Sequence, residues 1–448
     1  MAWPVFAQEP LSFDDALLRL QQRNEKLAAA GHAVDQARAE AGVARSRRWP
    51  TLNVEAQALR WDDPLVLEFS DTQISLPDLP IALPPLPLPT TRLEIDRQDY
   101  RSVLATAKQP LYAGGRIQAG IRAADAAVAA AQAQQLGEQG GLMLELVQRY
   151  FGQRLADQAV LVRQATRDSL GRHLDDARKL EREGQIARAE RLRAEVAWAE
   201  AQRELGDAQR QAEMARSALA VLLASEQGFD PSTPIPQAPA PQSLAQLKQR
   251  ALESNPQLTR VAQERVRAEQ GVRAVRGEFA PTIGLLALSR LYSRDPILQE
   301  PDWAIGVSLD WPLFDGFQRN HKLQGARAQL DRVESLQAAG RRDVELLVEQ
   351  RHQQLLNAHE QLQSYQTTRA LAEESLRAQR IAFAEGFATS LDVVDAELAL
   401  SRLRLGILST RYQAVVAQAG LYEASGESGR IREFVRAAPA AEGDGDVH

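Results

Sequence analysis

The chain contains no cysteine, and aromatic residues make up only 5% of its 448 residues. The lack of cysteine excludes disulfides and thiolate metal sites, and we expect no lipidated amino-terminal cysteine. The shortage of aromatic side chains is unusual for a long chain with one large core, and it favours long alanine-rich helices packed side by side. No run of 18 apolar residues occurs, so we expect no transmembrane helix.

The sequence also lacks the usual signs of nucleic-acid binding and of catalysis. Its formal net charge is −6, which argues against a nucleic-acid partner. It contains no phosphate-binding loop, dinucleotide-binding fingerprint or nucleophile elbow. The six histidines form no pair four residues apart, and we interpret them as isolated surface residues: His32, His173, His321, His352, His359 and His448. We therefore predict that the protein is not an enzyme and has no cofactor or metal site.

What the sequence does have is a large internal repeat, which should be sought before any local motif. Ser12, Arg19, Asn24, Leu27, Ala37, Arg45, Pro50 and Thr51 recur, at an offset of 231, as Ser243, Arg250, Asn255, Leu258, Ala268, Arg276, Pro281 and Thr282. Further along the offset is 202, and it relates Pro110-Leu111 to Pro312-Leu313, Glu183-Gly184 to Glu385-Gly386, and Ala194-Glu195 to Ala396-Glu397. The offset falls from 231 to 202, so the first half carries 29 extra residues in its loop. Constant offsets on both sides of one insertion are hard to obtain by chance.

Each half is therefore predicted to follow the same order of elements. The first half has a helix over 12–47, a strand over 51–61, a proline-rich loop over 62–99, a strand over 100–111, and helices over 116–182 and 188–224 separated by a turn at Gly184. The second half has a helix over 243–278, strands over 281–292 and 303–313, and helices over 317–383 and 389–424 separated by a turn at Gly386. We interpret the fold as α+β, built from a duplicated helix-strand-strand-helix unit.

These halves define the expected domain organisation. We predict a residual signal or amino-terminal segment over 1–10, a first repeat over 11–227, a linker over 228–242, a second repeat over 243–425 and a disordered tail over 426–448. The linker contains five prolines, and alanine, proline, glycine and aspartate are frequent at the end of the tail. Val5-Phe6-Ala7 resembles the end of a secretory signal peptide with cleavage after Ala7, although the basic and apolar regions that should precede it are missing. We interpret it as a truncated precursor start, and the alternative is an ordinary frayed terminus.

The fourth predicted strand has the clearest pattern. Its apolar face carries Trp303, Ile305, Val307, Leu309 and Trp311, and its other face carries small or polar residues. Aliphatic side chains flanked by tryptophans are typical of a strand whose face meets lipid, with the indoles at the two interfaces. We assign Trp61 to the same group of interface aromatics. The alternative is a soluble sheet that packs this face on a core.

The predicted helix lengths and strand number point to an assembly. In each half the two shorter helices together match the length of the long one, which indicates an elongated molecule with strands at one end. Four strands are too few to close a barrel, and an open edge in lipid would leave backbone groups without partners. Three copies would supply about 12 strands and enclose a lumen lined by the polar strand faces.

Four short motifs occur in order in each half. The first half has Asn24-x-x-Leu27, Pro50-Thr51-Leu52, Gln109-Pro110-Leu111-Tyr112-Ala113-Gly114-Gly115 and Gly184-x-x-x-Arg188-x-Glu190. The second has Asn255-Pro256-x-Leu258, Pro281-Thr282-Ile283, Trp311-Pro312-Leu313-Phe314-Asp315-Gly316 and Gly386-x-x-x-Ser390-x-Asp392-Val393-Val394-Asp395-Ala396. In this order and in duplicate, they resemble the TolC family of outer-membrane efflux proteins over about residues 11–425.

The resemblance implies a homotrimer in the outer membrane of a Gram-negative bacterium. Its strands would form a 12-stranded β-barrel in contact with outer-membrane lipid, continuous with a long α-helical coiled-coil tunnel in the periplasm. It would serve as the passive exit channel of a tripartite efflux or type I secretion system. A periplasmic adaptor (membrane fusion protein) and an inner-membrane transporter would open it by docking. Family members carry drugs, metal ions or polypeptides, and the sequence does not identify the cargo.

The resemblance also places a periplasmic gate at the helical turns. The positions that match the family's pore-facing acids are Glu190, Asp392 and Asp395. Asp392 and Asp395 are three residues apart and share a helical face, so three copies would cluster carboxylates that select cations. The alternative is that these residues are ordinary first-turn acids favoured by the helix dipole.

The chain departs from the family at the expected lock of this gate. Ala388 stands where the prototype has a gate-locking arginine, and Phe383 stands where a tyrosine often closes the same network. The locking hydrogen bonds are then either absent or supplied from the other repeat by Arg188 or Arg191. We expect the turns around Gly184 and Gly386 to form the adaptor-docking surface.

Two other classes of protein compete with this interpretation. A soluble periplasmic coiled-coil adaptor or scaffold would explain the helices, but it does not need alternating strands with terminal tryptophans. An enzyme with a helical-bundle site would need a cluster of ligands such as Glu-x-x-His, which the sequence lacks.

Overall fold

The computed structural model describes residues 10–60, 62, 65–69, 91–95, 99–293 and 302–437. Contacts divide the chain into two compact units, which we describe separately. The helical unit comprises Met1–Ala39, Ala124–Ala268 and Gln329–His448, and the sheet unit comprises Glu40–Ala123 and Glu269–Ala328. Trp61 and the end of the predicted tail, residues 438–448, lie outside the described residues.

The order of elements follows the predicted repeat. The first half contains β1 (Pro10–Leu11), α1 (Phe13–Arg23), α2 (Glu25–Ser46), β2 (Thr51–Arg60), β3 (Leu65–Phe69), β4 (Thr91–Ile95), β5 (Asp99–Ala113), α3 (Arg116–Arg182) and α4 (Arg188–Leu222). The linker between the halves contains β6 (Asp230–Pro231). The second half and the tail contain α5 (Leu244–Ser254), α6 (Pro256–Gly277), β7 (Thr282–Ser293), β8 (Trp303–Asp310), α7 (Gln318–Ala384), α8 (Ser390–Ala424) and α9 (Arg430–Ala437).

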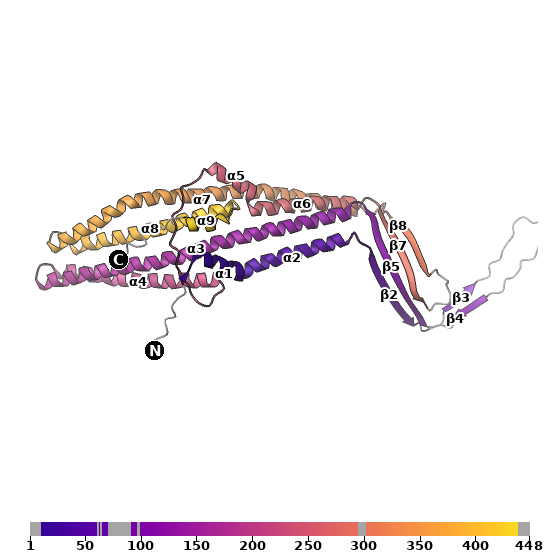
Figure 1. The fold of residues 1–448 in the computed structure, drawn as a ribbon, viewed down its shortest axis with the longest axis horizontal. Coiled ribbons are helices and arrows are strands. Elements are labelled where there is room, and N and C mark those ends of the chain that lie inside the picture. Colours follow the sequence, from indigo (N-terminus) through magenta and orange to yellow (C-terminus); the bar gives the residue numbers. More distant parts are fainter. Residues whose placement is uncertain are drawn as a thin grey trace, which may run out of the picture. The chain divides into compact units, whose positions relative to one another are not determined.

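Corresponding helices of the two halves have equal lengths. Helices α1 and α5 contain 11 residues each, α2 and α6 contain 22, α3 and α7 contain 67, and α4 and α8 contain 35. The long helices α3 and α7 agree with the predicted ranges 116–182 and 317–383 to within one residue. Each long helix turns back into a shorter one, so that α3 with α4 and α7 with α8 form two helical hairpins (Figure 1). Among the described residues, no helix is both long enough and apolar enough to cross a membrane.

The helix predicted over 12–47 is broken at Asn24, so the prediction of one continuous helix is wrong. Asn24 has extended backbone angles, and its side-chain oxygen accepts hydrogen bonds from the backbone N–H groups of Lys26 and Leu27. Its side-chain nitrogen donates to the carbonyl of Leu222 at 3.4 Å. The asparagine thus ends α1, caps α2 and connects both to the end of α4.

The helix predicted over 243–278 is broken in the same way at Asn255. Its side-chain oxygen accepts from the backbone N–H groups of Gln257 and Leu258, and its nitrogen donates to the carbonyl of Ala424 at 2.8 Å. The break therefore repeats, contact for contact, in the second half of the chain.

The largest core of the helical unit surrounds three buried aromatic side chains, Phe13, Tyr150 and Phe151. Their ring centroids lie 5.1, 5.4 and 5.6 Å apart. The Tyr150 hydroxyl donates to the carbonyl of Leu11 at 2.6 Å and accepts from the backbone N–H of Thr233 at 2.9 Å. This core therefore joins α1, α3 and the segment between the halves, which itself contributes buried side chains and strand β6, paired in parallel with β1.

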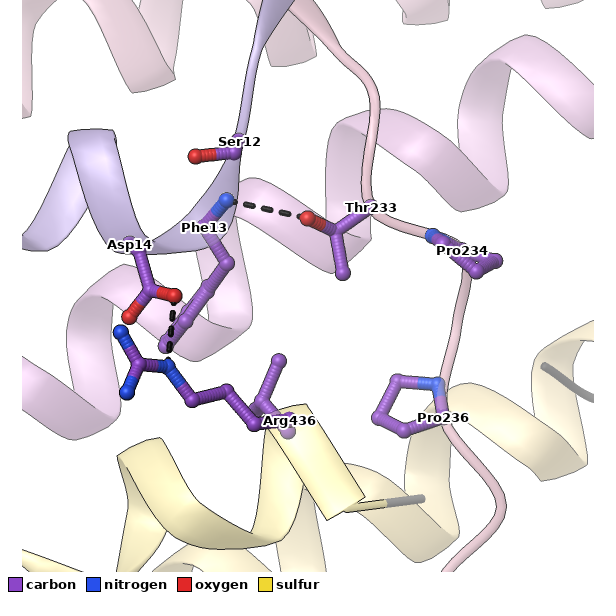
Figure 2. A pocket seen from close by; sticks show the side chains of 8 residues that line it. Ser12, Phe13, Asp14, Thr233, Pro234, Pro236 and Arg436 are labelled. Carbon is purple, nitrogen blue, oxygen red and sulfur yellow. Dashed lines mark hydrogen bonds and ion pairs between the residues drawn. The ribbon is translucent and has the colours of Figure 1, made fainter. Parts of the chain in front are cut away.

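The prediction of a disordered tail over 426–448 is wrong for residues 430–437, which form α9. Ile431, Phe434 and Val435 are buried, so one face of this short helix is held by the core. On another face, Arg432 and Arg436 each donate to the carboxylate of Asp14 at 2.7 Å. Figure 2 shows the bond from Arg436. Burial alone would raise the pKa of Asp14, but the hydrogen bonds and charges of these arginines outweigh it and lower the pKa.

The sheet unit holds one antiparallel sheet of four strands in the order β2-β5-β7-β8, which lie side by side in Figure 1. The observed strands match the predicted ranges closely, except that β8 ends at Asp310, so Trp311 lies just outside it. The loop prediction for 62–99 needs a correction as well. Residues Leu65–Phe69 and Thr91–Ile95 pair as the antiparallel strands β3 and β4, because each is a short run rich in β-branched or aliphatic residues.

The pairing register gives the main sheet one apolar face. It aligns small or aliphatic residues across all four strands, as in the row Leu52, Ala107, Ala287 and Ile305. The alternate residues of β8 on this face are between 63% and 68% exposed: Trp303, Ile305, Val307 and Leu309. No described part of the chain covers this face, so the alternative of a soluble sheet packed on a core is not what the described chain forms. The other face of β2 is polar and carries Thr51, Asn53, Glu55 and Gln57.

Candidate functional site

The two helical hairpins end in turns of the same geometry. Gly184, between α3 and α4, has φ +74°, and Gly386, between α7 and α8, has φ +80°. In both turns the glycine N–H and the next N–H bond back to carbonyls of the preceding helical turn, as in a Schellman motif. A left-handed backbone favours glycine, which explains why each hairpin has one at this position.

A direct contact between the hairpins lies next to these turns. Glu190, in the first turn of α4, accepts a hydrogen bond at 2.9 Å from the backbone N–H of Ser390, the first residue of α8. The same carboxylate accepts a bond from Arg193 at 2.7 Å. Glu190 therefore satisfies an N–H group at the start of the opposite hairpin, where a negative charge is also favoured by the helix dipole.

His173 of α3 completes this contact from the other side. Its Nε2 atom lies 2.7 Å from the hydroxyl of the buried Ser390, and its ring packs edge-on against Phe383 with centroids 4.6 Å apart. Burial lowers the pKa of His173, and the nearby charge of Arg380 lowers it further, while Asp176 and Glu190 act in the opposite direction. The interpretation of His173 as an isolated surface residue is therefore wrong. It is wrong for His352 too, which is buried 2.9 Å from a backbone carbonyl of the linker.

A second contact lies about two turns farther from the tips. The buried carboxylate of Glu397 in α8 accepts a hydrogen bond from Ser169 of α3 at 2.5 Å and one from Arg380 of α7 at 2.7 Å. Arg380 also donates to the Ser169 hydroxyl. Three helices from both hairpins thus meet at one charged group, with Thr166 and Ser401 hydrogen-bonded beside it at 2.9 Å.

A cavity of about 480 Å³ lies between the ends of α3 and α7. Its walls include His173, Phe383 and Arg380, together with charged side chains of both signs on α3. Phe383 itself is buried, in a small apolar cluster with Leu174 and Val393. The predicted aromatic at this position therefore serves as core between the hairpins.

The two predicted acids of α8 have different surroundings. Asp392 forms a capping box with Thr389, accepting from its hydroxyl at 2.7 Å and from its backbone N–H at 2.8 Å. These hydrogen bonds lower the pKa of Asp392. Asp395, one turn later, is exposed. The helix-capping interpretation thus holds for Asp392, which also remains exposed.

The arginines of the first turn do not join the hairpins in this structure. Arg191 pairs with Glu181 at 2.7 Å and with Glu195, both in its own hairpin. Arg188 is exposed. The alternative of a cross-hairpin bond from Arg191 is therefore not met. The hairpins are connected instead by Glu190 with Ser390, and by Ser169 with Glu397 and Arg380.

Several residues of this site were not expected from the sequence. Ser169, His173, Arg380 and Glu397 have no motif, and their partners lie up to 228 residues away. One weak signal exists for Glu397: it is the second-half counterpart of Glu195 in the repeat. Phe387, which is 85% exposed directly after Gly386, was also missed. Among the described residues, no three histidine or carboxylate side chains are grouped as metal ligands would be.

The comparisons with known proteins agree on one class. The family model described as "Outer membrane efflux protein" matches residues 16–225 and 247–427. The cobalt-zinc-cadmium resistance protein CzcC of Cupriavidus metallidurans is 29% identical over 337 residues, which cover 72% of this chain and 78% of CzcC.

Solved structures show the same fold. A structure of CusC superimposes with a TM-score of 0.76 at 19% identity, covering 92% of this chain and 91% of that one. The outer membrane protein VceC of Vibrio cholerae gives a TM-score of 0.75 at 17% identity, covering 92% and 96%.

These matches, with the exposed apolar sheet face and the paired hairpins, define an outer-membrane channel rather than a soluble helical scaffold. The chain belongs to the outer membrane efflux protein family. It is an exit channel for efflux, with a periplasmic helical part, and its family consists of channels and not of enzymes.

Proposed function

We propose that the protein works as a homotrimer whose 12 strands close a barrel in the outer membrane. The support is the state of the sheet edges: within the described chain, β2 and β8 each pair on one side only. An edge left open in lipid would lack hydrogen-bond partners, and three copies joined β8 to β2 remove every edge. The exposed apolar face would then contact lipid, with Trp303 and Trp311 at the interfaces, and Trp61 assigned there by sequence alone.

The two halves are, on this proposal, copies of one helix-strand-strand-helix unit. Equal helix lengths support it, and so do the matching contacts of Asn24 and Asn255. Because each of the three chains contains two copies of the unit, the trimer would have six similar helical hairpins around its axis. We propose the domain boundaries of the sequence analysis on the same basis, with the tail shortened to begin after α9.

The gate lies at the tips of the hairpins. Asp395 and Asp392 are exposed near the turn of α8, where three copies would bring six carboxylates together. Such a cluster favours cations in the lumen and resists closure through like-charge repulsion. Glu190 has a different role in this proposal: it accepts a hydrogen bond from the start of α8 and is not one of the six carboxylates that line the lumen at the tips.

Opening follows when a periplasmic adaptor and an inner-membrane transporter dock at the turns. Gly184 and Gly386 shape these turns, and the exposed ring of Phe387 offers an apolar contact there. Docking would separate the hairpins by breaking the bond of Glu190 to Ser390 and the bonds of Ser169 to Glu397 and Arg380, while Arg188 stays exposed on the surface.

Divalent metal ions are the cargo that we propose. The observation that carries this is the similarity to CzcC, whose name states cobalt, zinc and cadmium resistance. The exposed carboxylates at the tips suit the passage of cations, which need no dedicated binding site in a passive channel.

Planar-bilayer conductance of the purified protein tests the channel and its gate together. We expect a small, cation-selective conductance that loses selectivity for cations in Asp395→Asn and in Asp392→Asn. Asp331→Asn, an exposed aspartate of α7 far from the turn in sequence, is the matched control and should leave selectivity unchanged. If the conductance does not change in either tip variant, the channel stands but the gate assignment is rejected. If the protein gives no conductance and stays soluble without detergent, the channel itself is rejected.

A further inference from the structure

The junctions between strands and helices repeat within the chain. In the first half, Gln109 donates to the carbonyl of Arg48 at 2.8 Å. In the second half, Trp311 donates to the carbonyl of Phe279 at 3.2 Å. Both residues are related to their counterparts by the offsets of the repeat, so the two junctions have the same internal geometry.

Between the halves, one junction packs tightly on the next. The turn at Gly114 approaches the end of α6 so closely that a Cβ atom there would lie 2.2 Å from the carbonyl oxygen of Gly277 and 2.9 Å from the Cβ of Ala280. Arg116, next to this turn, donates to the hydroxyl of Thr282 at 2.8 Å. Only small residues fit at this contact inside the chain.

The counterpart of this contact is missing inside the chain. Gly316 corresponds to Gly114, yet nothing lies within 4 Å of a Cβ placed there. Around it, Phe314 is 77% exposed and Phe317 is 60% exposed, with their rings edge-on at 5.7 Å. At the other edge of the sheet, Trp49 corresponds to Ala280 and is 71% exposed.

The order of the strands indicates which residues of another copy would lie next to Gly316. The patch of Phe314 and Phe317 follows β8, Trp49 precedes β2, and these strands are the two edges of the sheet. The register puts the start of β2 and the end of β8 at the same end of the sheet. If copies join β8 to β2, each patch meets the Trp49 junction of the next copy.

Phe317 carries a further sign of this contact. Its φ is +66°, in the left-handed region, where its first-half counterpart is Gly115 with φ +78°. A bulky residue in this region is strained, and such strain persists where another interaction compensates for it. Within the described chain the ring of Phe317 makes its aromatic contact with Phe314, and both rings remain largely exposed.

We propose that Phe314 and Phe317 of one copy pack against Trp49 of the next copy and form an aromatic contact at each of the three subunit boundaries. In the same contact, Gln318 takes the place of Arg116 and bonds to Thr51 of the next copy. Phe317 and Trp49 thus take, at the junction between copies, the positions that Gly115 and Ala280 hold at the junction within a chain. Phe314 corresponds to Tyr112, so that position is aromatic in both halves. The inference rests on the trimer proposed above, and it names the residues that would join neighbouring copies where β2 begins and β8 ends.

Because the chain has no cysteine, pairwise cross-linking can test the contact directly. In the variant Trp49→Cys/Phe317→Cys, a short bis-maleimide should convert most of the protein into covalent dimers and trimers on denaturing gels. The matched control is Trp49→Cys/Tyr112→Cys, in which the cysteine replaces the first-half counterpart of Phe314, and it should give no such ladder. A trimer seen by native mass spectrometry without the ladder overturns this contact alone, whereas a monomer overturns the proposed trimer as well.

Stability of the trimer gives a second measurement. Phe317→Gly removes the backbone strain and introduces the residue found in the first half. If Phe317 had no role at the interface, this change should therefore stabilise the protein. We expect instead that the trimer dissociates roughly tenfold faster or more, as loss of a buried aromatic contact at an interface predicts. Phe387→Gly, which removes a phenylalanine that is more exposed and lies outside the junction, is the control and should not change dissociation. In a variant whose Trp61, Trp303 and Trp311 are replaced by phenylalanine, quenching of the Trp49 fluorescence by brominated lipid in the assembled trimer would show that lipid covers Trp49 and would overturn the proposal.

Discussion

The contact of Arg380 with the buried carboxylate of Glu397 provides the sharpest test of the gate. Arg380→Ala removes one of the two hydrogen-bond donors to this carboxylate and leaves Ser169 as the other. Both residues belong to the α7–α8 hairpin, and Arg380 also donates to Ser169 of the other hairpin. If the hairpins separate when the channel opens, this bond to Ser169 exists only in the closed arrangement. Its removal should therefore favour the open channel.

The structure limits the size of the effect. The bond that spans the hairpins joins the charged Arg380 to the Ser169 hydroxyl, and a hydrogen bond that involves a charged group contributes about 1.5–3 kcal/mol. The side chain of Arg380 is 44% exposed, so water replaces part of what is lost and the lower range applies. We take about 2 kcal/mol, which corresponds to a shift of roughly 30-fold in the ratio of open to closed channel.

Single-channel recording in planar bilayers measures this ratio as the fraction of time spent open. Arg377→Ala is the matched control, because Arg377 is exposed on the same helix and pairs with Glu374 one turn away. A surface pair of this kind contributes about 0.5 kcal/mol or less, so the control should change the ratio little. Glu397→Gln combined with Arg380→Ala should have less than the sum of the single effects. Equal effects of Arg377→Ala and Arg380→Ala, or strict additivity with Glu397→Gln, would refute the reasoning.

Three further predictions concern other contacts of the helical unit. Because the folded pKa of His173 is lowered, its contribution to stability is present above about pH 6.5 and is lost as the pH falls below that value. His173→Gln should flatten the fall of the melting temperature between about pH 7 and pH 5, and an unchanged profile would contradict this. Asp14→Asn should weaken the bond from Arg432, lower the free energy of unfolding in urea by about 1 kcal/mol and speed proteolysis at α9. Unchanged proteolysis would contradict the role of Asp14 in holding α9. Gly386→Ala should destabilise by about 1 kcal/mol because of its φ of +80°, whereas Gly325→Ala inside α7 should stabilise by about 0.5–1 kcal/mol; a gain at Gly386 would be inconsistent with the turn geometry.

The helices and strands were predictable where the local pattern is long or duplicated. The composition of 116–182 predicts α3, the repeat predicts α7, and the alternation over 303–311 predicts β8, since each signal extends over many residues. The breaks at Asn24 and Asn255 were missed, although each lies in a visible Asn-x-x-Leu motif. An asparagine that caps the following helix with its side chain is a local signal, and it was available.

The tail shows the opposite case. Residues 430–437 are too few and too polar to predict a stable helix by themselves. They fold because Phe434 and Ile431 reach the core and because Asp14, more than 400 residues earlier, binds Arg432 and Arg436. Such a helix depends on partners that no local window contains.

The sequence by itself determined the duplicated order of elements, the polar and apolar faces of the strands, and membership in a class of outer-membrane channels. These follow from periodicity and repetition, which are properties of the chain read in order. Only the tertiary structure decided which charged residue does what at the tips. Glu190, Asp392 and Asp395 look alike in sequence, but Glu190 binds the start of α8, Asp392 caps its own helix, and Asp395 stays exposed. The role of a carboxylate depends on the donors that surround it: the donor to Glu190 comes from a helix 200 residues away, whereas the donor to Asp392 lies three residues before it.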